Sequence, residues 1–192
     1  MVGAGPISSE DAINWGFTGP CLRAAGVGLD ARIYDPYNGY DQLKFDIPVG
    51  TRGDSYARYM VRMEEIHQSC NIIEQMLDNI PSGEVQVADP AVSFPSKADV
   101  YDNIEGLMNH FMLVIHGVQP PPGDIYHYGE GANGELGFYV VSDGSSKPYR
   151  VKCRPPCFAI FQAFPEMLRG QMIADAIAEL GSINIIAGEL DR

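Results

Sequence analysis

The chain has 192 residues, 45% of them hydrophobic, which is enough to bury one sizeable core or two small ones. Its 13 basic and 25 acidic residues give a net charge of −12, which argues against general affinity for nucleic acid or anionic lipid surfaces. No run approaches the roughly 20 consecutive apolar residues of a spanning helix, and the start of the chain lacks an export signal. We expect a globular chain on the reducing side of a membrane, with its four cysteines as free thiols and no membrane span of its own.

The first 53 residues predict a short helix and then a long loop. Ser8 and Ser9 precede Glu10, a pattern typical of a helix N-terminus, and Gly16 ends that helix. Residues 26–53 have no helical periodicity, are rich in tyrosine and show one strand-like alternation at 45–49. We expect this loop to lie against a neighbouring element.

Residues 53–81 carry the strongest helical signal. Asp54 is the expected N-cap, and Pro81 follows the end. Apolar residues recur in steps of three and four, which predicts a seam buried in a helical bundle. The seam comprises Tyr56, Tyr59, Met63, Ile66, Cys70, Ile73, Leu77 and Ile80. Polar residues fill the opposite face, where we interpret the pair Glu64 and Glu65 as solvated.

A second helix is predicted at 99–116, ended by Gly117, so residues 54–117 form bundle helices. Residues 135–192 have a different pattern. Strand-like runs at 136–141 and 149–153 predict an antiparallel hairpin, followed by helices at 158–169, broken at Pro165, and at 172–180. We expect the apolar tail at 183–187 to be buried. The predicted fold class is α+β, predominantly helical.

Few residues indicate chemistry by themselves. Cys153 and Cys157 do not match the spacing of a zinc or redox pair and are interpreted as buried thiols, and no motif predicts a resident metal or a catalytic residue. Residues 129–134 are rich in glycine, but we expect no strand before them, so they are a weak phosphate loop.

Three cations alternate along the second hairpin strand: Arg150, Lys152 and Arg154. One interpretation is a solvated strand face. The other is an electrostatic patch that faces an acidic partner or an anionic redox intermediate.

Several segments, in this order, resemble conserved stretches of one family: 50–54 (GTRGD), 59–65 (YMVRMEE), 139–144 (YVVSDG), 147–152 (KPYRVK) and 188–192 (GELDR). The family is the D subunit of respiratory complex I, the NADH:quinone oxidoreductase. The resemblance spans nearly the whole chain and begins partway through the family's sequence. It implies that residues 1–192 are a single C-terminal fragment, and that the missing N-terminal half supplies the side chains that grip the quinone headgroup.

The resemblance also implies kinship with the large subunit of nickel-iron hydrogenases, whose C-terminal thiolates bind the metal. At the corresponding positions of this tail stand Ile186 and Glu189, which cannot replace two soft thiolates. The expected fold is therefore the C-terminal part of the hydrogenase large-subunit-like fold, with a cavity for an organic substrate where the metal was. Asn184 replaces an aspartate common in relatives, which puts a proton-donating role there in doubt.

By resemblance, the chain is a core subunit in which electrons pass from NADH to quinone, coupled to proton translocation. It binds no cofactor itself, because FMN and the iron–sulfur clusters lie on partner subunits, and the isolated fragment is expected to be inactive. The expected partners are the iron–sulfur small subunit, the C subunit, the membrane-arm subunits and the missing N-terminal half. The complex is expected on the cytoplasmic side of the bacterial membrane, or on the matrix side of the mitochondrial inner membrane. The residues expected at the quinone-cavity wall or its interface are Asn184, Ile186, Glu189, Asp191 and Arg192.

Two alternatives remain open from the sequence. One is a hydrogenase-related large subunit that still handles metal, against which the absent thiolates argue. The other is a non-catalytic scaffold or assembly protein of the same fold.

Overall fold

The computed structural model describes residues 1–191 and contains helices and a three-stranded sheet, so the fold class is α+β. The elements, in chain order, are α1 (Ser9–Asn14), α2 (Gly19–Ala24), α3 (Ala31–Tyr34), the 3-10 helix η1 (Tyr40–Gln42), α4 (Ser55–Asp78), α5 (Lys97–Asp102), α6 (Ile104–Ile115), β1 (Gly123–Gly131), β2 (Gly134–Ser142), β3 (Arg150–Arg154), α7 (Pro156–Gln162), α8 (Phe164–Met167), α9 (Asp175–Ile183) and α10 (Ala187–Leu190).

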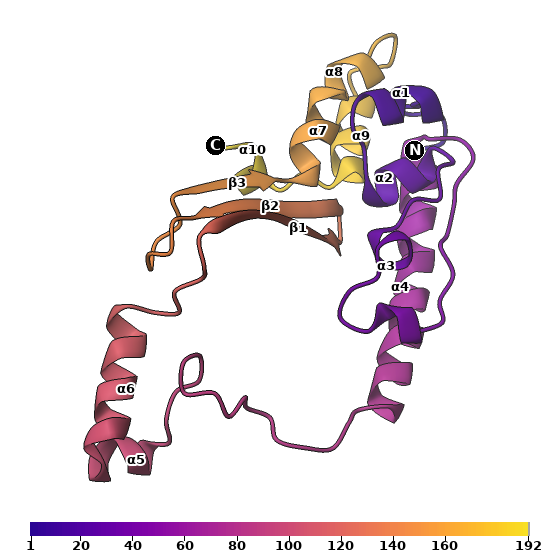
Figure 1. The fold of residues 1–192 in the computed structure, drawn as a ribbon. Coiled ribbons are helices and arrows are strands. Elements are labelled where there is room, and N and C mark those ends of the chain that lie inside the picture. The colour runs from indigo at the N-terminus through magenta and orange to yellow at the C-terminus, as the bar shows by residue number, and fades with distance from the viewer. Residues whose placement is uncertain (192) are drawn as a thin grey trace. The chain divides into compact units, whose positions relative to one another are not determined.

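The chain divides into two compact units. The first contains residues 1–79, 127–138 and 153 onward, and the second contains residues 80–126 and 139–152. The core of the first unit joins segments far apart in sequence, because Phe17 and Leu22 near α2 pack with Ile160 of α7 and Ile183 of α9. Figure 1 shows α7, α8 and α9 beside α1 and α2. The candidate site lies in this unit.

Helix α4 confirms the predicted long helix and its N-cap. Asp54 Oδ1 accepts a hydrogen bond from the Ala57 amide at 2.8 Å, which satisfies a backbone donor in the first turn. Asp54 Oδ2 accepts a second bond from the Gly3 amide at 2.8 Å. The cap therefore also holds the start of the chain against α4.

Within the described residues the apolar seam of α4 is exposed, and its burial in a larger helical bundle stays a prediction. Ile66, Ile73 and Leu77 are 55%, 56% and 65% exposed, whereas Arg58 on the other face is fully buried. The seam is exposed because the helices that pack against α4 lie on its other face. Helices α2 and α9 pack against the face that carries Ala57 and Arg58, so nothing in residues 1–191 covers the seam.

The helix predicted at 99–116 is two helices. Asn103 is extended, with φ −138° and ψ 128°, and its side chain caps α6 by accepting from the Glu105 amide at 2.9 Å. Helix α5 folds back on α6 so closely that a Cβ on Gly106 would clash with the Asp99 carbonyl. Local capping at Asn103 thus overrides the continuous apolar pattern.

The predicted hairpin is confirmed as β2 and β3, but the sheet has a third strand and the order β1-β2-β3. β1 leads directly into the glycine-rich residues 129–134, so the expectation that no strand precedes them is wrong. Ile125 of β1 is 64% exposed, and β1 contains three glycines. Such a strand has neither the apolar alternation nor the β-branched content from which strands are recognised.

The other expected elements hold in part. Residues 45–49 join no sheet, and the segment before them forms α3 and η1 instead. The break near Pro165 is confirmed between α7 and α8. The tail is less buried than expected, because the chain turns at Asn184 and leaves Ile186 49% exposed. None of the helices in residues 1–191 has the length and apolar character required to cross a membrane.

Candidate functional site

The guanidinium group of Arg23 joins three elements at the candidate site, and Arg23 is 1% exposed. Its Nε donates to Glu65 Oε1 at 2.7 Å, and its Nη1 donates to Glu130 Oε1 at 2.8 Å and to the Leu29 carbonyl at 2.9 Å. Arg23 lies on α2, Glu65 on α4 and Glu130 on β1. Burial alone would lower the pKa of Arg23, but Glu130 and Glu65 outweigh it and the pKa is raised.

Asp30 and Arg32 extend this cluster. Arg32 donates to both carboxylate oxygens of Asp30, from Nε at 2.9 Å and from Nη2 at 2.7 Å. Burial opposes ionisation of Asp30, but the bonds from Arg32 outweigh it and lower the pKa of Asp30. The cluster holds two guanidinium groups against three carboxylates. Burial raises the pKa of Glu65 despite the attraction of Arg23, so Glu65 is a carboxyl group at which the cluster can take up a proton.

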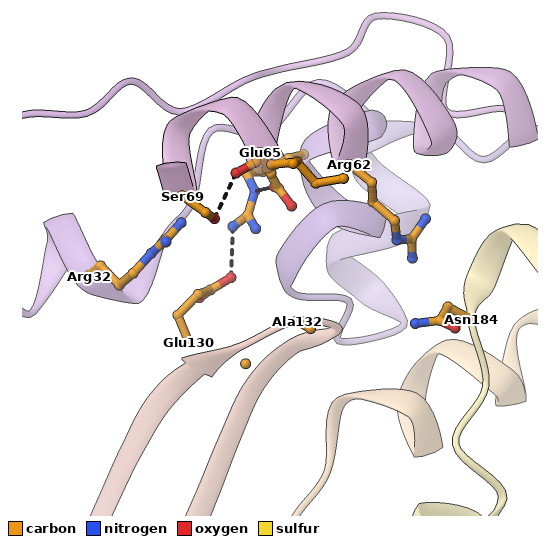
Figure 2. Close-up of a pocket in the computed structure, with 10 residues that line it drawn as sticks. Arg32, Arg62, Glu65, Ser69, Glu130, Ala132 and Asn184 are labelled. Atoms are coloured by element: carbon orange, nitrogen blue, oxygen red, sulfur yellow. Dashed lines mark hydrogen bonds and ion pairs between the residues drawn. The ribbon is translucent and has the colours of Figure 1, made fainter. Parts of the chain in front are cut away.

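A cavity of about 370 Å³ opens beside the cluster, and Glu65, Glu130 and Asn184 are among its lining residues (Figure 2). Figure 2 shows Arg62 extending from α4 toward the segment that carries Asn184. Arg62 Nη1 donates to the Ser182 carbonyl at 2.6 Å. Among residues 1–191, no carboxylate lies within ion-pairing distance of Arg62. One wall of the cavity therefore carries a cation that is held by a carbonyl group.

Arg58 of α4 and Glu179 of α9 are two further buried residues of opposite charge. Arg58 donates from Nη1 to the Gly53 carbonyl at 2.7 Å and from Nη2 to the Gly5 carbonyl at 3.0 Å, and its Nε donates to Ser182 Oγ at 2.9 Å. Glu179 of α9 is fully buried, and neither of its carboxylate oxygens has a hydrogen-bond partner in the described part of the chain. Burial raises the pKa of Glu179 and lowers that of Arg58, and their opposite charges reduce both shifts.

The tail is fixed beside the cavity by hydrogen bonds. Asn184 ends α9 in the left-handed region, with φ 53° and ψ 59°, and its Nδ2 donates to Asn133 Oδ1 at 2.7 Å. Further along, Glu189 Oε2 accepts from the Cys157 amide at 3.0 Å. Burial, with the hydrogen bond to Glu189, raises the pKa of the Cys157 thiol to about 11. Cys157 is therefore a neutral thiol at physiological pH.

Comparison with known proteins decides the family. The family described as the 49 kDa subunit of respiratory-chain NADH dehydrogenase matches residues 1–192. The chain belongs to this 49 kDa subunit family. It is 62% identical over 187 residues, 97% of its length, to the C/D subunit of NADH-quinone oxidoreductase from Bdellovibrio bacteriovorus. It is 54% identical over 189 residues to the D subunit from Leptospira biflexa and 50% identical over 190 residues to the D subunit from Myxococcus xanthus, which is 98% and 99% of the chain.

The family assignment from the sequence is thereby confirmed. The chain spans 33% of the Bdellovibrio protein, 47% of the Leptospira protein and 46% of the Myxococcus protein. It therefore corresponds to between a third and a half of these members of the 49 kDa subunit family.

Two of the tail residues expected from the sequence belong to one hydrogen-bonded group in this family member. Asn184 lines the cavity, and Glu189 is bound to α7. Ile186 and Asp191 are exposed, and Arg192 lies outside the described residues. No three or more His, Cys, Asp or Glu residues converge in a metal-binding arrangement within residues 1–191.

The three cations of β3 have different environments. Arg150 and Lys152 are exposed. Arg154 is half-buried, where its Nη1 donates to Thr18 Oγ1 at 3.1 Å and to the Glu135 carbonyl at 2.7 Å. Arg154 thus connects β3 with the loop before α2, in addition to any electrostatic effect it has.

The sequence interpretation missed Arg23, Arg62, Glu130 and Asn133. It also placed Glu65 on a solvated face, which is wrong because the Glu65 carboxylate binds buried Arg23. One signal was available. Glu130 and Asn133 lie in the glycine-rich run 129–134, where they are the two polar residues among the glycines.

Proposed function

We propose that this chain forms part of the core subunit of an NADH:quinone oxidoreductase, where it contributes one wall of the quinone chamber. Electrons pass from NADH through FMN and iron–sulfur clusters on other subunits to quinone, and the reaction is coupled to proton translocation. The chain alone is catalytically silent in this proposal. The family match over all 192 residues supports the assignment. The observation that carries the site assignment is the cavity bordered jointly by Arg62 of α4 and Asn184 of the tail.

The cavity has the chemistry that a quinone headgroup requires. A quinone presents two carbonyl acceptors, and its reduced form carries negative charge until protons arrive. The guanidinium of Arg62 supplies a positive charge and N–H donors at the wall, and Ile66 supplies an apolar contact. Glu65, with its raised pKa, is a carboxyl group that can hold a proton at the same wall.

We also propose the hydrogenase-like fold, with residues 54–117 as bundle helices and 135–192 as the hairpin, helices and tail. The donor set of the tail does not suit a nickel cradle. Ile186 has no donor atom, and the Glu189 carboxylate accepts a bond from the Cys157 amide. These observations support an organic substrate rather than retained metal chemistry.

The expected surroundings follow from the same proposal. The facing wall of the chamber is the small subunit with the terminal iron–sulfur cluster, and the membrane-arm subunits are further partners. The C subunit is a further neighbour, which the joint C/D name of the Bdellovibrio relative supports. The complex is peripheral to the membrane, on the cytoplasmic face in bacteria or on the matrix face in mitochondria.

Charge removal at the tail tests the proposal in the assembled enzyme. Asp191→Asn and Arg192→Gln are expected to lower NADH:quinone activity about tenfold, which corresponds to about 1.4 kcal/mol. Reduction of ferricyanide, an acceptor that does not need the quinone chamber, should be unchanged. Glu10→Gln on the exposed surface of α1 is the matched control. Equal loss of both activities would indicate an assembly defect and contradict the proposal.

A further inference from the structure

The second half of the turn between β1 and β2 is buried, although hairpin turns ordinarily lie at the surface. Asn133, the second of its two residues, is 4% exposed. The next residue, Gly134, contacts the start of α2 so closely that a Cβ on Gly19 would clash with its backbone. The turn is therefore held from one side by α2, and its other side is available to the tail.

Asn133 and Asn184 form a reciprocal pair of hydrogen bonds. Asn133 Nδ2 donates to the Asn184 backbone carbonyl at 3.1 Å, and Asn184 Nδ2 donates to Asn133 Oδ1 at 2.7 Å. Asn133 Nδ2 also donates to Cys157 Sγ at 3.3 Å. Both ends of the Asn133 amide are thus used, since Nδ2 donates two hydrogen bonds and Oδ1 accepts one. Asn133 binds the tail through both the backbone and the side chain of Asn184.

The chain changes direction at Asn184, where α9 ends and the tail begins. The left-handed backbone of Asn184, with φ 53°, is strained for a non-glycine residue unless local bonds compensate. The bonds with Asn133 provide that compensation. A second anchor, the bond from the Cys157 amide to Glu189, lies five residues further along. Ile185 and Ile186 lie between these two fixed points.

We propose that Asn133 is a positioning residue for the quinone chamber, which acts by holding Asn184 and so setting the course of the tail. This inference rests on the proposed function, because it takes the tail to border the quinone. Asn184 lines the cavity, whereas Asn133 is buried in the second half of the turn and does not line it. Asn133 therefore acts through Asn184 and does not touch the substrate.

The test is a double-mutant cycle in the assembled enzyme, with a short-chain ubiquinone and a short-chain menaquinone as the probes. Asn133→Ala and Asn184→Ala are each expected to raise the KM for quinone by about three- to tenfold with a smaller change in kcat, because the wall is displaced while electron delivery is intact. Ferricyanide reduction should be unchanged. The double variant should be no worse than the poorer single variant, since Asn133→Ala already removes both bonds of the pair and Asn184→Ala removes one of the same two.

A conservative variant and a control complete the experiment. Asn133→Asp keeps the oxygen that accepts from Asn184 but places a carboxylate oxygen against the Asn184 carbonyl, so its KM should be at least as high as that of Asn133→Ala. It also carries the test if the alanine variant fails to assemble. Asn14→Ala, on the exposed surface of α1, should match the wild type.

The outcomes separate this inference from the proposed function. If Asn184→Ala and Asp191→Asn alter quinone kinetics and neither Asn133 variant does, the positioning role is wrong and the proposed function stands. Additive effects of Asn133→Ala and Asn184→Ala would also overturn the positioning role, as would equal loss of quinone and ferricyanide activity in Asn133→Asp. If none of the tail or turn variants alters quinone kinetics, the proposed function itself fails.

Discussion

Arg23 Nε and Glu65 Oε1 lie 2.7 Å apart between α2 and α4, and the arginine side chain is almost completely removed from solvent. The same guanidinium binds Glu130 on β1 at 2.8 Å. A single cation thus compensates carboxylates from two other elements. The stability of this part of the fold depends on keeping that cation, because a buried carboxylate without a partner is costly.

Replacing Arg23 with Met keeps much of the volume and removes the charge. We expect Arg23→Met to lower the free energy of unfolding by about 3–5 kcal/mol, since Glu65 and Glu130 remain in the interior without their cation. Urea unfolding of the chain measures this. Arg169→Met is the control, because its ion pair with Glu166 is exposed and should contribute at most about 1 kcal/mol. Equal losses in the two variants would show that the Arg23 cluster contributes no more than a surface pair.

Glu179 predicts a specific pH dependence. Burial, opposed by Arg58 and assisted by the charge of Asp175, raises its pKa in the folded state above the ordinary value of 4.5. Below that value the carboxyl group is protonated in both the folded and the unfolded state. As the pH rises from about 4.5 to the folded pKa, the unfolded state ionises before the folded state does, so stability is lost across this window and stays constant above it.

Glu179→Gln should remove this loss. The variant is expected to be more stable than the wild type at about pH 7, and the difference should disappear toward about pH 4. Urea midpoints across this range measure the effect. Glu74→Gln, at an exposed position of α4, should follow the wild type. A constant difference between Glu179→Gln and the wild type at all pH values would contradict a buried, hard-to-ionise carboxyl group.

The sequence predicted the parts of the fold that depend on neighbouring residues. The Asp54 cap and the length of α4 follow from a local pattern, and so do the strands β2 and β3. The Arg23 cluster does not, because its partners Glu65 and Glu130 lie 42 and 107 residues away in the chain. A polar residue on an amphipathic helix looks solvated until the element that covers it is known.

In the candidate site, too, contacts between residues far apart in the sequence could not be predicted. Asn184 and Glu189 were expected from the resemblance of the tail to the family, whereas Asn133 was not. The role of Asn133 depends on a turn that the sequence does not predict, because β1 carries few of the residues that favour strands. Pairing of a turn amide with a helix-terminal amide 51 residues later has no local signal.

The seam of α4 predicts self-association of the isolated chain. Ile73 and Leu77 are both more than half exposed, and such apolar surface associates in water. We expect Ile73→Gln with Leu77→Gln to lower the molar mass measured by light scattering. The free energy of unfolding should change by no more than about 0.5 kcal/mol per site, since neither side chain is buried. Glu74→Gln, on the same helix, should not alter the molar mass. An unchanged mass in the double variant would place the association surface elsewhere.

The cysteines predict a distinct order of thiol reactivity. Cys70 is exposed, whereas Cys157 is buried and has a pKa of about 11. At about pH 8 only on the order of 0.1% of such a thiol is ionised, and the thiolate is the reactive species. We therefore expect Cys70 to react rapidly with a disulfide reagent in the native state, and Cys157 to react only after unfolding. Single-cysteine variants that keep only Cys70 or only Cys157 separate the two rates.

Fast native labelling of Cys157 would mean that the contact between α7 and the tail opens readily. The bonds from the tail to Asn133 and to the Cys157 amide would then be too weak to fix the wall of the cavity.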